Sequence, residues 1–117
     1  MAIPELAARC PVTTTVTTAV GRLDPALEAG LYFFCAEGLS NVAKHASAND
    51  VLVSVRASSG EVLAEVTDDG VGGADLRGSG LRGLSDRISA LGGTFEVIAV
   101  NPHGVRLLAQ VPTGSAI

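Results

Sequence analysis

A cluster of glycines is the feature that most constrains how this chain can fold. Directly after a strand-like run that ends in Asp68 and Asp69, six glycines fall within fourteen residues: Gly70, Gly72, Gly73, Gly78, Gly80 and Gly83. Glycine tolerates positive φ and has no Cβ, but it costs about 1 kcal/mol relative to alanine, so such clustering needs a reason. The pattern predicts a loop whose backbone approaches a ligand closely, and a phosphate-bearing ligand fits it best.

The composition indicates one folded, acidic domain. The chain has 117 residues, of which 47% are hydrophobic and 17% charged, so it can bury a single core and is not a disordered segment. Its mean hydropathy of +0.40 predicts that some apolar surface faces a partner. The formal net charge of -4, with only eight Lys and Arg, argues against a nucleic-acid partner. An acidic domain can still bind a nucleotide through backbone amides and a metal.

The cysteines and the apolar segments indicate a cytoplasmic domain. Cys10 and Cys35 have neither the spacing of a zinc site nor the density of a disulfide scaffold, so both are expected to be reduced, buried thiols. No segment approaches the roughly 20 apolar residues that cross a bilayer, and the N-terminus lacks a basic region followed by an apolar stretch. We therefore expect no contact between this domain and a membrane.

Helix and strand signals give a mixed order of elements. Residues 3–10 read as the end of a helix stopped by Pro11, and residues 12–20 read as a Thr- and Val-rich strand. Asp24 and Pro25 open a helix that is predicted to run to about Ala46. Two alternating strands at 50–57 and 61–67 follow, joined by a hairpin turn at residues 58–60.

After the glycine loop, the spacing of apolar residues predicts a helix over 81–91 that ends at Gly92 and Gly93. Residues 94–100 and 105–111 then make a last hairpin. With about five strands and about three helices, the predicted fold class is α+β, a two-layer sandwich with the helices on one face of the sheet.

The long helix is predicted to have a broad apolar face and, beside it, a rim of polar residues. At 100° per residue, Glu37, Asn41 and Lys44 lie within an arc of about 60°, so a carboxylate, an amide and an ammonium share one rim. They flank a broad apolar face made of Leu27, Leu31, Phe34, Cys35, Gly38, Leu39, Val42 and Ala46. A solvated helix face with a Glu-to-Lys pair is the alternative. Asparagine in mid-helix is intrinsically unfavourable, which points weakly toward function.

Three motifs that follow one another along the chain favour a functional role for these polar residues. They are EGLSNVAKHA at 37–46, DDGVG at 68–72, and GSGLRGL at 78–84 with Arg87 beyond. Together they resemble the N, G1 and G2 boxes of the ATP-binding catalytic domain of two-component sensor histidine kinases, of the Bergerat-type ATPase superfamily. The Asn-x-x-Lys-His-Ala run and the short gap between glycine boxes look like the subfamily that includes nitrate and membrane-fluidity sensors. The resemblance covers roughly residues 5–112 and implies a mixed, mostly antiparallel sheet.

The resemblance assigns the base-reading end of the site to the first glycine box. It implies that Asp68 accepts a hydrogen bond from the adenine amino group, while Gly70 and Gly72 let the backbone lie along the base. A carboxylate suits an exocyclic amine, whereas guanine offers a carbonyl there and would leave a buried oxygen unpaired. Turn chemistry at a strand end is the alternative for Asp68.

The resemblance also assigns residues to Mg²⁺ and to the phosphates. It implies that Asn41 is a ligand of the Mg²⁺ bound to ATP, a role suited to a hard amide oxygen. Glu37 would orient a water or the metal's surroundings and is a candidate base. Lys44 offers a positive charge to the phosphates, and His45 is either a phosphate or metal neighbour or a packing histidine.

Backbone groups complete the phosphate side of the expected site. The segment from Gly78 through Gly80 to Leu81 would present N–H groups at a helix start, where the helix dipole favours polyphosphate. A merely flexible glycine loop is the alternative.

Two features depart from the wider family pattern. Only residues 74–77 stand between the glycine boxes, so the lid that many relatives close over ATP is very short. We expect weak nucleotide retention and hypothesise that Asp75 reaches Lys44 or His45 in the empty site. The last hairpin carries Gly104 and Val105 where relatives usually have Gly-Thr, which removes a hydroxyl that could hold a water against adenine.

The resemblance implies that this domain is the catalytic half of a larger kinase. A sensor kinase needs a phosphoacceptor histidine on a dimerising helix pair, and neither His45 nor His103 can serve. We expect residues 1–117 to be a single catalytic domain, with residues 1–10 as the end of a connecting helix and 112–117 as a tail. Alone it would be a monomer. Its partners would be the dimerisation domain of the same kinase and then a response regulator, with a membrane anchor in the full-length protein left open.

Two other classes stay open from the sequence. An anti-sigma-factor-like serine kinase uses the same nucleotide fold to phosphorylate a protein partner, although the Lys-His-Ala run favours the sensor kinase. A pure interaction module would keep the fold with a degenerate nucleotide site.

Overall fold

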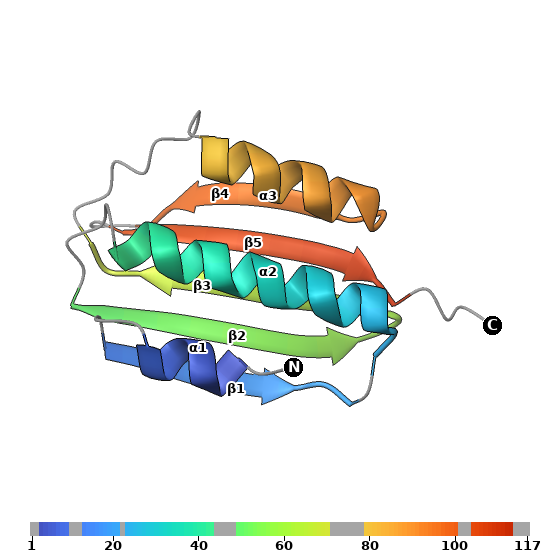
Figure 1. Ribbon diagram of the computed structural model, residues 1–117, viewed down its shortest axis with the longest axis horizontal. Helices are drawn as coiled ribbons and strands as arrows, with labels where there is room; N and C mark the ends of the chain where they lie inside the picture. The colour runs from blue at the N-terminus through green and yellow to red at the C-terminus, as the bar shows by residue number, and fades with distance from the viewer. Residues whose placement is uncertain are drawn as a thin grey trace.

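Within the described residues, five strands form one sheet and three helices lie on one of its faces (Figure 1). The computed structural model describes residues 3–9, 13–21, 23–43, 49–70, 79–100 and 104–113. In chain order the elements are α1 (Ile3–Arg9), β1 (Thr13–Ala19), α2 (Pro25–Asn41), β2 (Asp50–Ser58), β3 (Glu61–Asp68), α3 (Ser79–Ala90), β4 (Thr94–Ala99) and β5 (Val105–Pro112). The order across the sheet is β1-β2-β3-β5-β4.

The pairing of the strands makes the sheet mixed and mostly antiparallel. Edge strand β1 runs parallel to β2, and the other three pairings are antiparallel. The predicted α+β two-layer fold class is therefore confirmed, and each expected helix and strand is present with ends that differ by a few residues. Strand β5 extends to Pro112, and the next residue, Thr113, donates its N–H to the Gly60 carbonyl at 2.9 Å.

Helix α2 begins where its capping residues predict. The Asp24 side chain accepts the N–H of Ala26 at 2.9 Å, and Pro25 occupies the first turn, where its missing N–H costs nothing. The helix continues through a π turn at Val42 and Ala43, and the rest of the expected extension to Ala46 lies outside the described residues. Of the predicted apolar face, every member but Ala46 is described, and each of those is buried.

Turn chemistry closes the β2–β3 hairpin. Ser59 and Gly60 both have positive φ, at 53° and 82°, which is the geometry of a two-residue hairpin turn. Side chains then alternate along both strands, and Val53 and Val66 are opposite each other on the helix-facing side. This alternation determines which side of the sheet each later residue of β3 occupies.

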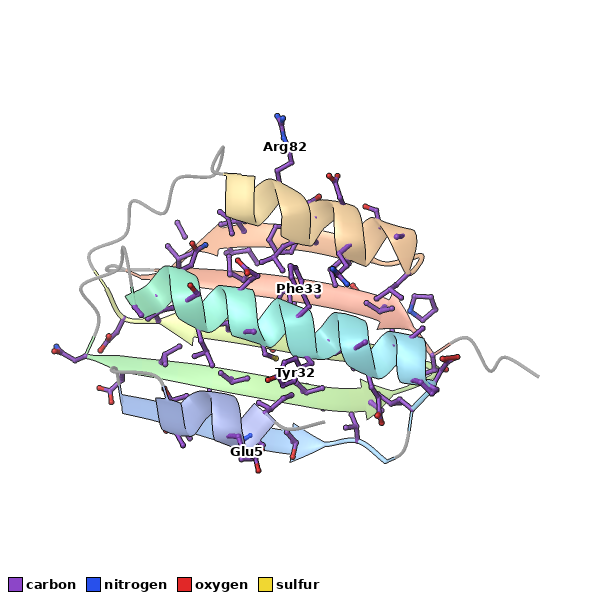
Figure 2. All side chains as sticks on the ribbon, viewed as in Figure 1. Glu5, Tyr32, Phe33 and Arg82 are labelled. Atoms are coloured by element: carbon purple, nitrogen blue, oxygen red, sulfur yellow. The ribbon has the colours of Figure 1, made fainter. Side chains whose placement is uncertain are left out.

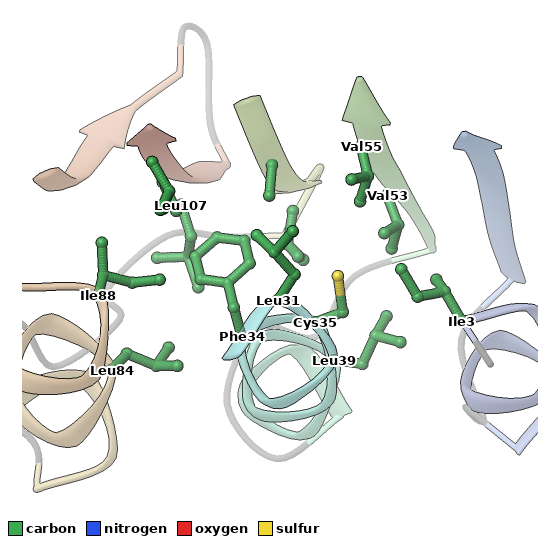
Figure 3. Packing of buried hydrophobic residues seen from close by; sticks show 14 of the residues in the cluster. Ile3, Leu31, Phe34, Cys35, Leu39, Val53, Val55, Leu84, Ile88 and Leu107 are labelled. Atoms are coloured by element: carbon green, nitrogen blue, oxygen red, sulfur yellow. The ribbon is translucent and has the colours of Figure 1, made fainter. Parts of the chain in front are cut away.

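The core lies between the sheet and the helices. Figure 3 shows Leu31, Phe34 and Cys35 of α2 reaching toward the sheet, with Leu84 and Ile88 of α3 beside them. The rings of Phe34 and Phe95 meet edge to face with centroids 6.2 Å apart. Cys35 is a free, buried thiol as expected, whereas Cys10 lies outside the described residues.

Helix α3 ends in a glycine cap. Gly92 has φ 79°, and its N–H donates to the Ser89 carbonyl at 2.9 Å while the Gly93 N–H donates to Ile88 at 3.0 Å. This pair of hydrogen bonds is a Schellman motif, which the two glycines predicted.

The other face of the sheet carries no helix among the described elements and is largely polar. Glu65, 16% exposed, lies between Arg56 at 3.5 Å and Arg106 at 3.4 Å. The Arg106 contact is an ion pair without hydrogen-bond geometry. Leu52 is the one large apolar side chain that is clearly exposed in the described part, at 42%.

Candidate functional site

Three elements end or begin at the same side of the molecule. The last turns of α2, the end of β3 and the first turn of α3 all lie at the left in Figure 1. Helix α2 passes close to β3 there, since a Cβ on Gly38 would lie 2.9 Å from Cγ2 of Val66. From this contact, Asn41 is about 4.5 Å further along the helix axis, and Asp68 is about 6.6 Å further along the strand. The fold thus brings the first and second motifs together.

Asp68 is the buried member of this group. It is 8% exposed and is the one buried polar or charged side chain in the part of the chain that the structure describes. Strand alternation from Val62 through Val66 places it on the helix-facing side. Its Oδ1 accepts the N–H of Gly70 at 2.8 Å, and the carboxylate has further lone pairs for a donor. Burying a carboxylate costs free energy unless it is hydrogen-bonded or paired with a charge. The buried position of Asp68 therefore points to a functional role.

The start of β5 closes against the backbone of Asp68. Gly104 has φ 124°, and a Cβ there would overlap the Asp68 carbonyl oxygen. Its neighbour Val105 pairs with Asp68 in register and is 9% exposed, so an apolar side chain lies next to the carboxylate. Nothing in the sequence indicated this contact, because Gly104 and Asp68 are 36 residues apart in the chain.

Asp69 is a second residue whose contacts sequence reasoning missed. Its Oδ1 accepts the N–H of Asn49 at 2.9 Å and the N–H of Asp50 at 3.0 Å. Its own N–H donates to the Asp50 carbonyl at 3.3 Å. In the sequence, the adjacent pair Asp68 and Asp69 was the only sign of these contacts. It did not show that the two carboxylates have different roles.

The polar residues of α2 lie where helical spacing predicts. Glu37 and Asn41 are half-buried, one turn apart, in the last turns of the helix. Lys44 and His45 lie outside the described residues, as does the proposed contact of Asp75. Their assigned roles stay predictions.

The second glycine box begins α3. Helix α3 starts at Ser79, so Gly80 is in its first turn, and Leu81 is 3% exposed and anchors that turn in the core. The backbone N–H groups of the first turn have no carbonyl partners within the helix, which makes such a terminus suited to anions. Gly72 and Gly78 lie outside the described residues.

Burial removes Cys35 from the list of reactive groups. Desolvation raises the pKa of its thiol from 9.0 to about 12, so the side chain is neutral and behaves as a small apolar residue. It packs in the core between α2 and the sheet.

Neither a metal cluster nor a membrane-spanning helix is found in the described part of the chain. There, no group of three or more His, Cys, Asp or Glu side chains gathers into a metal cluster. No described helix is long and apolar enough to span a membrane.

Comparison with curated proteins gives several sensor kinases, although no family model matches the chain. The histidine kinase/phosphatase UhpB of Salmonella typhimurium is 36% identical over 85 residues, or 70% of this chain. The oxygen sensor histidine kinase NreB of Staphylococcus carnosus is 32% identical over 96 residues, or 78% of this chain. The chain spans only 17% and 28% of the lengths of these two relatives.

Solved structures agree on the fold. The blue-light activated histidine kinase EL346 of Erythrobacter litoralis superposes with a TM-score of 0.82 at 18% identity, over 97% of this chain and 40% of that one. The ATP-binding domain of PrrB from Mycobacterium tuberculosis gives a TM-score of 0.69 at 22% identity, over 97% and 90%. By sequence similarity to the curated kinases the chain belongs to the sensor histidine kinase family, and its fold is that of the solved ATP-binding domain of PrrB.

Proposed function

We propose that this domain binds Mg·ATP where α2, β3 and α3 meet, and donates the γ-phosphate to a histidine on a separate dimerisation domain. The observation that best supports the proposal is Asp68 at the end of β3, the one buried carboxylate among the described residues. The end of β3 lies at the same side of the molecule as the polar end of α2 and the first turn of α3, the elements suited to the metal and the phosphates.

Asp68 would read the base. Its Oδ1 is held by the Gly70 N–H, so the carboxylate has a defined direction before any ligand arrives. An adenine amino group would supply a donor to it, whereas the guanine carbonyl would face it with a second acceptor. Val105 beside it is apolar and suits the face of a base. Discrimination between ATP and GTP is therefore expected.

Asn41 would bind the metal, and the start of α3 would bind the phosphates. Mg²⁺ prefers oxygen ligands and usually keeps several waters, so one amide oxygen together with ATP phosphates is a sufficient donor set. Bound Mg²⁺ would neutralise charge on the phosphates. Glu37 lies one turn before Asn41 on the same rim and is the candidate base. The N–H groups near Gly80 would hold polyphosphate at the start of α3.

The phosphotransfer needs a second domain. A bond forms between the acceptor histidine nitrogen and the γ-phosphorus as the bond from that phosphorus to the bridging oxygen of ADP breaks. The phosphohistidine would then supply a response regulator. Since ATP is the donor, we place the domain in the cytoplasm.

Calorimetric titration tests the nucleotide part of the proposal. We expect Mg·ATP to bind more tightly than Mg·GTP, and Asp68→Ala to weaken Mg·ATP roughly 10- to 100-fold. Glu96→Ala is the control, because Glu96 is exposed on β4 between two core-facing neighbours and so points away from the helices. Absence of Mg·ATP binding at millimolar ligand would instead favour an interaction module.

Addition of the dimerisation domain tests the transfer. We expect an acid-labile phosphohistidine on that domain and its loss in Asn41→Ala. An acid-stable phosphoserine on a protein partner would favour the anti-sigma-factor-like kinase.

A further inference from the structure

Asp69 joins the end of β3 to the start of β2 after the regular ladder has ended. The last register pair between these strands is Asp68 with Val51. Beyond it, the Asp69 carboxylate accepts N–H groups of Asn49 and Asp50 at 2.9 and 3.0 Å, and the Asp69 N–H donates to the Asp50 carbonyl at 3.3 Å. One side chain therefore bonds to two successive amides 19 and 20 residues away in the chain.

These bonds hold the backbone of Asp68 from one side. On the other side, Gly104 packs against the Asp68 carbonyl with no room for a Cβ. Asp68 thus lies between two fixed neighbours, β2 through Asp69 and β5 through Gly104. Its carboxylate is in turn held by the N–H of Gly70, the residue that follows Asp69.

We infer that Asp69 is a positioning residue for the base-reading carboxylate. Its hydrogen bonds to Asn49 and Asp50 fix the turn at residues 68–70 on β2, and this fixes the direction in which Asp68 presents its oxygens. The inference rests on the proposed binding of Mg·ATP. Charge-assisted hydrogen bonds to backbone N–H groups are among the stronger ones, so an exposed carboxylate can do this. Hydrogen bonding falls steeply with angle, so a reoriented Asp68 would read adenine poorly.

The test compares Asp69→Ala with Asp69→Asn by calorimetric titration of Mg·ATP and Mg·GTP. We expect Asp69→Ala to weaken Mg·ATP about tenfold and to reduce the preference for ATP over GTP. Asp69→Asn keeps an oxygen acceptor, so it should recover most of both quantities. Amide hydrogen exchange at Asn49 and Asp50 should be faster in Asp69→Ala and close to wild type in Asp69→Asn.

Asp24→Ala is the matched control. Asp24 is also an exposed aspartate that accepts a backbone N–H at 2.9 Å, but it caps the opposite end of α2. Its loss should lower the melting temperature and leave both affinities unchanged. If Asp24→Ala weakened Mg·ATP as much as Asp69→Ala does, general destabilisation would explain the effect and the inference would be wrong.

The outcomes separate this inference from the proposed function. In one outcome, wild type binds Mg·ATP, and Asp69→Ala loses amide protection but keeps its affinity and its preference for ATP within about twofold. Asp69 would then only stabilise the local backbone, so the inference would be wrong while the proposed function would stand. If wild type binds no Mg·ATP, the proposed function fails and the inference fails with it.

Discussion

Gly38 of α2 lies directly on Val66 of β3, where a Cβ on the glycine would lie 2.9 Å from Cγ2 and 3.1 Å from Cβ of the valine. Val66 is β-branched and buried, so it has little freedom to move aside. The contact lets the helix approach the sheet closely. It also fixes how far Glu37 and Asn41 stand from the end of β3.

Gly38→Ala is expected to destabilise the domain despite the better helix propensity of alanine. Propensity would add about 1 kcal/mol to the free energy of unfolding, but overpacking against Val66 costs about 1–3 kcal/mol. Gly83→Ala in α3 is the control, because a Cβ there meets nothing within 4 Å, and it should stabilise the domain by about 0.5–1 kcal/mol. Urea denaturation measures both. Equal effects of the two substitutions would show that the contact with Val66 does not limit packing.

Cys35 predicts a loss of stability at alkaline pH. Below pH 9.0 the thiol is protonated in both the folded and unfolded states, so it contributes no pH dependence. Between pH 9.0 and about 12 the unfolded chain releases the proton and the folded chain keeps it. The free energy of unfolding should therefore fall with rising pH, by about 1.4 kcal/mol per unit. Denaturation of wild type and Cys35→Ala at pH 7 to 10.5 isolates this slope, which should be absent from the variant.

Arg87 of α3 lies over the ring of Phe33 of α2, with its guanidinium carbon 4.0 Å from the ring centroid. This cation–π contact joins the two helices that flank the site, and it is expected to contribute about 0.5–1 kcal/mol. A double-mutant cycle of Arg87→Ala and Phe33→Leu should give a coupling of that size. Arg82→Ala is the control, since Arg82 points away from the sheet on the same helix (Figure 2). A coupling no larger than that between Arg82 and Phe33 would contradict the prediction.

Local chemistry made most of the fold predictable from sequence. The Asp24 cap, the positive-φ turn at Gly60 and the glycine cap at Gly92 each depend on residues within a few positions, and each was predicted. Three motifs likewise indicated a candidate site, because helical spacing and strand alternation are local. The contacts of Gly104 with Asp68 and of Asp69 with Asn49 depend on strands that meet only after folding. No pattern along the chain encodes them, so only the structure reveals them.

Gly104→Ala should damage both the fold and the proposed nucleotide site. Its φ of 124° is strained for alanine, and the new Cβ would overlap a main-chain carbonyl, that of Asp68, which cannot rotate away. We expect a loss of at least about 3 kcal/mol in the free energy of unfolding. Gly60→Ala is the matched control: its φ is 82° but a Cβ there meets nothing within 4 Å, so it should cost about 1–2 kcal/mol from backbone strain alone. Relief of the overlap would shift Asp68, so Gly104→Ala should weaken Mg·ATP in calorimetry at a temperature where it is still folded, whereas Gly60→Ala should not. Equal stability losses in the two variants would mean that β5 yields at Gly104 and that Asp68 is not held from that side.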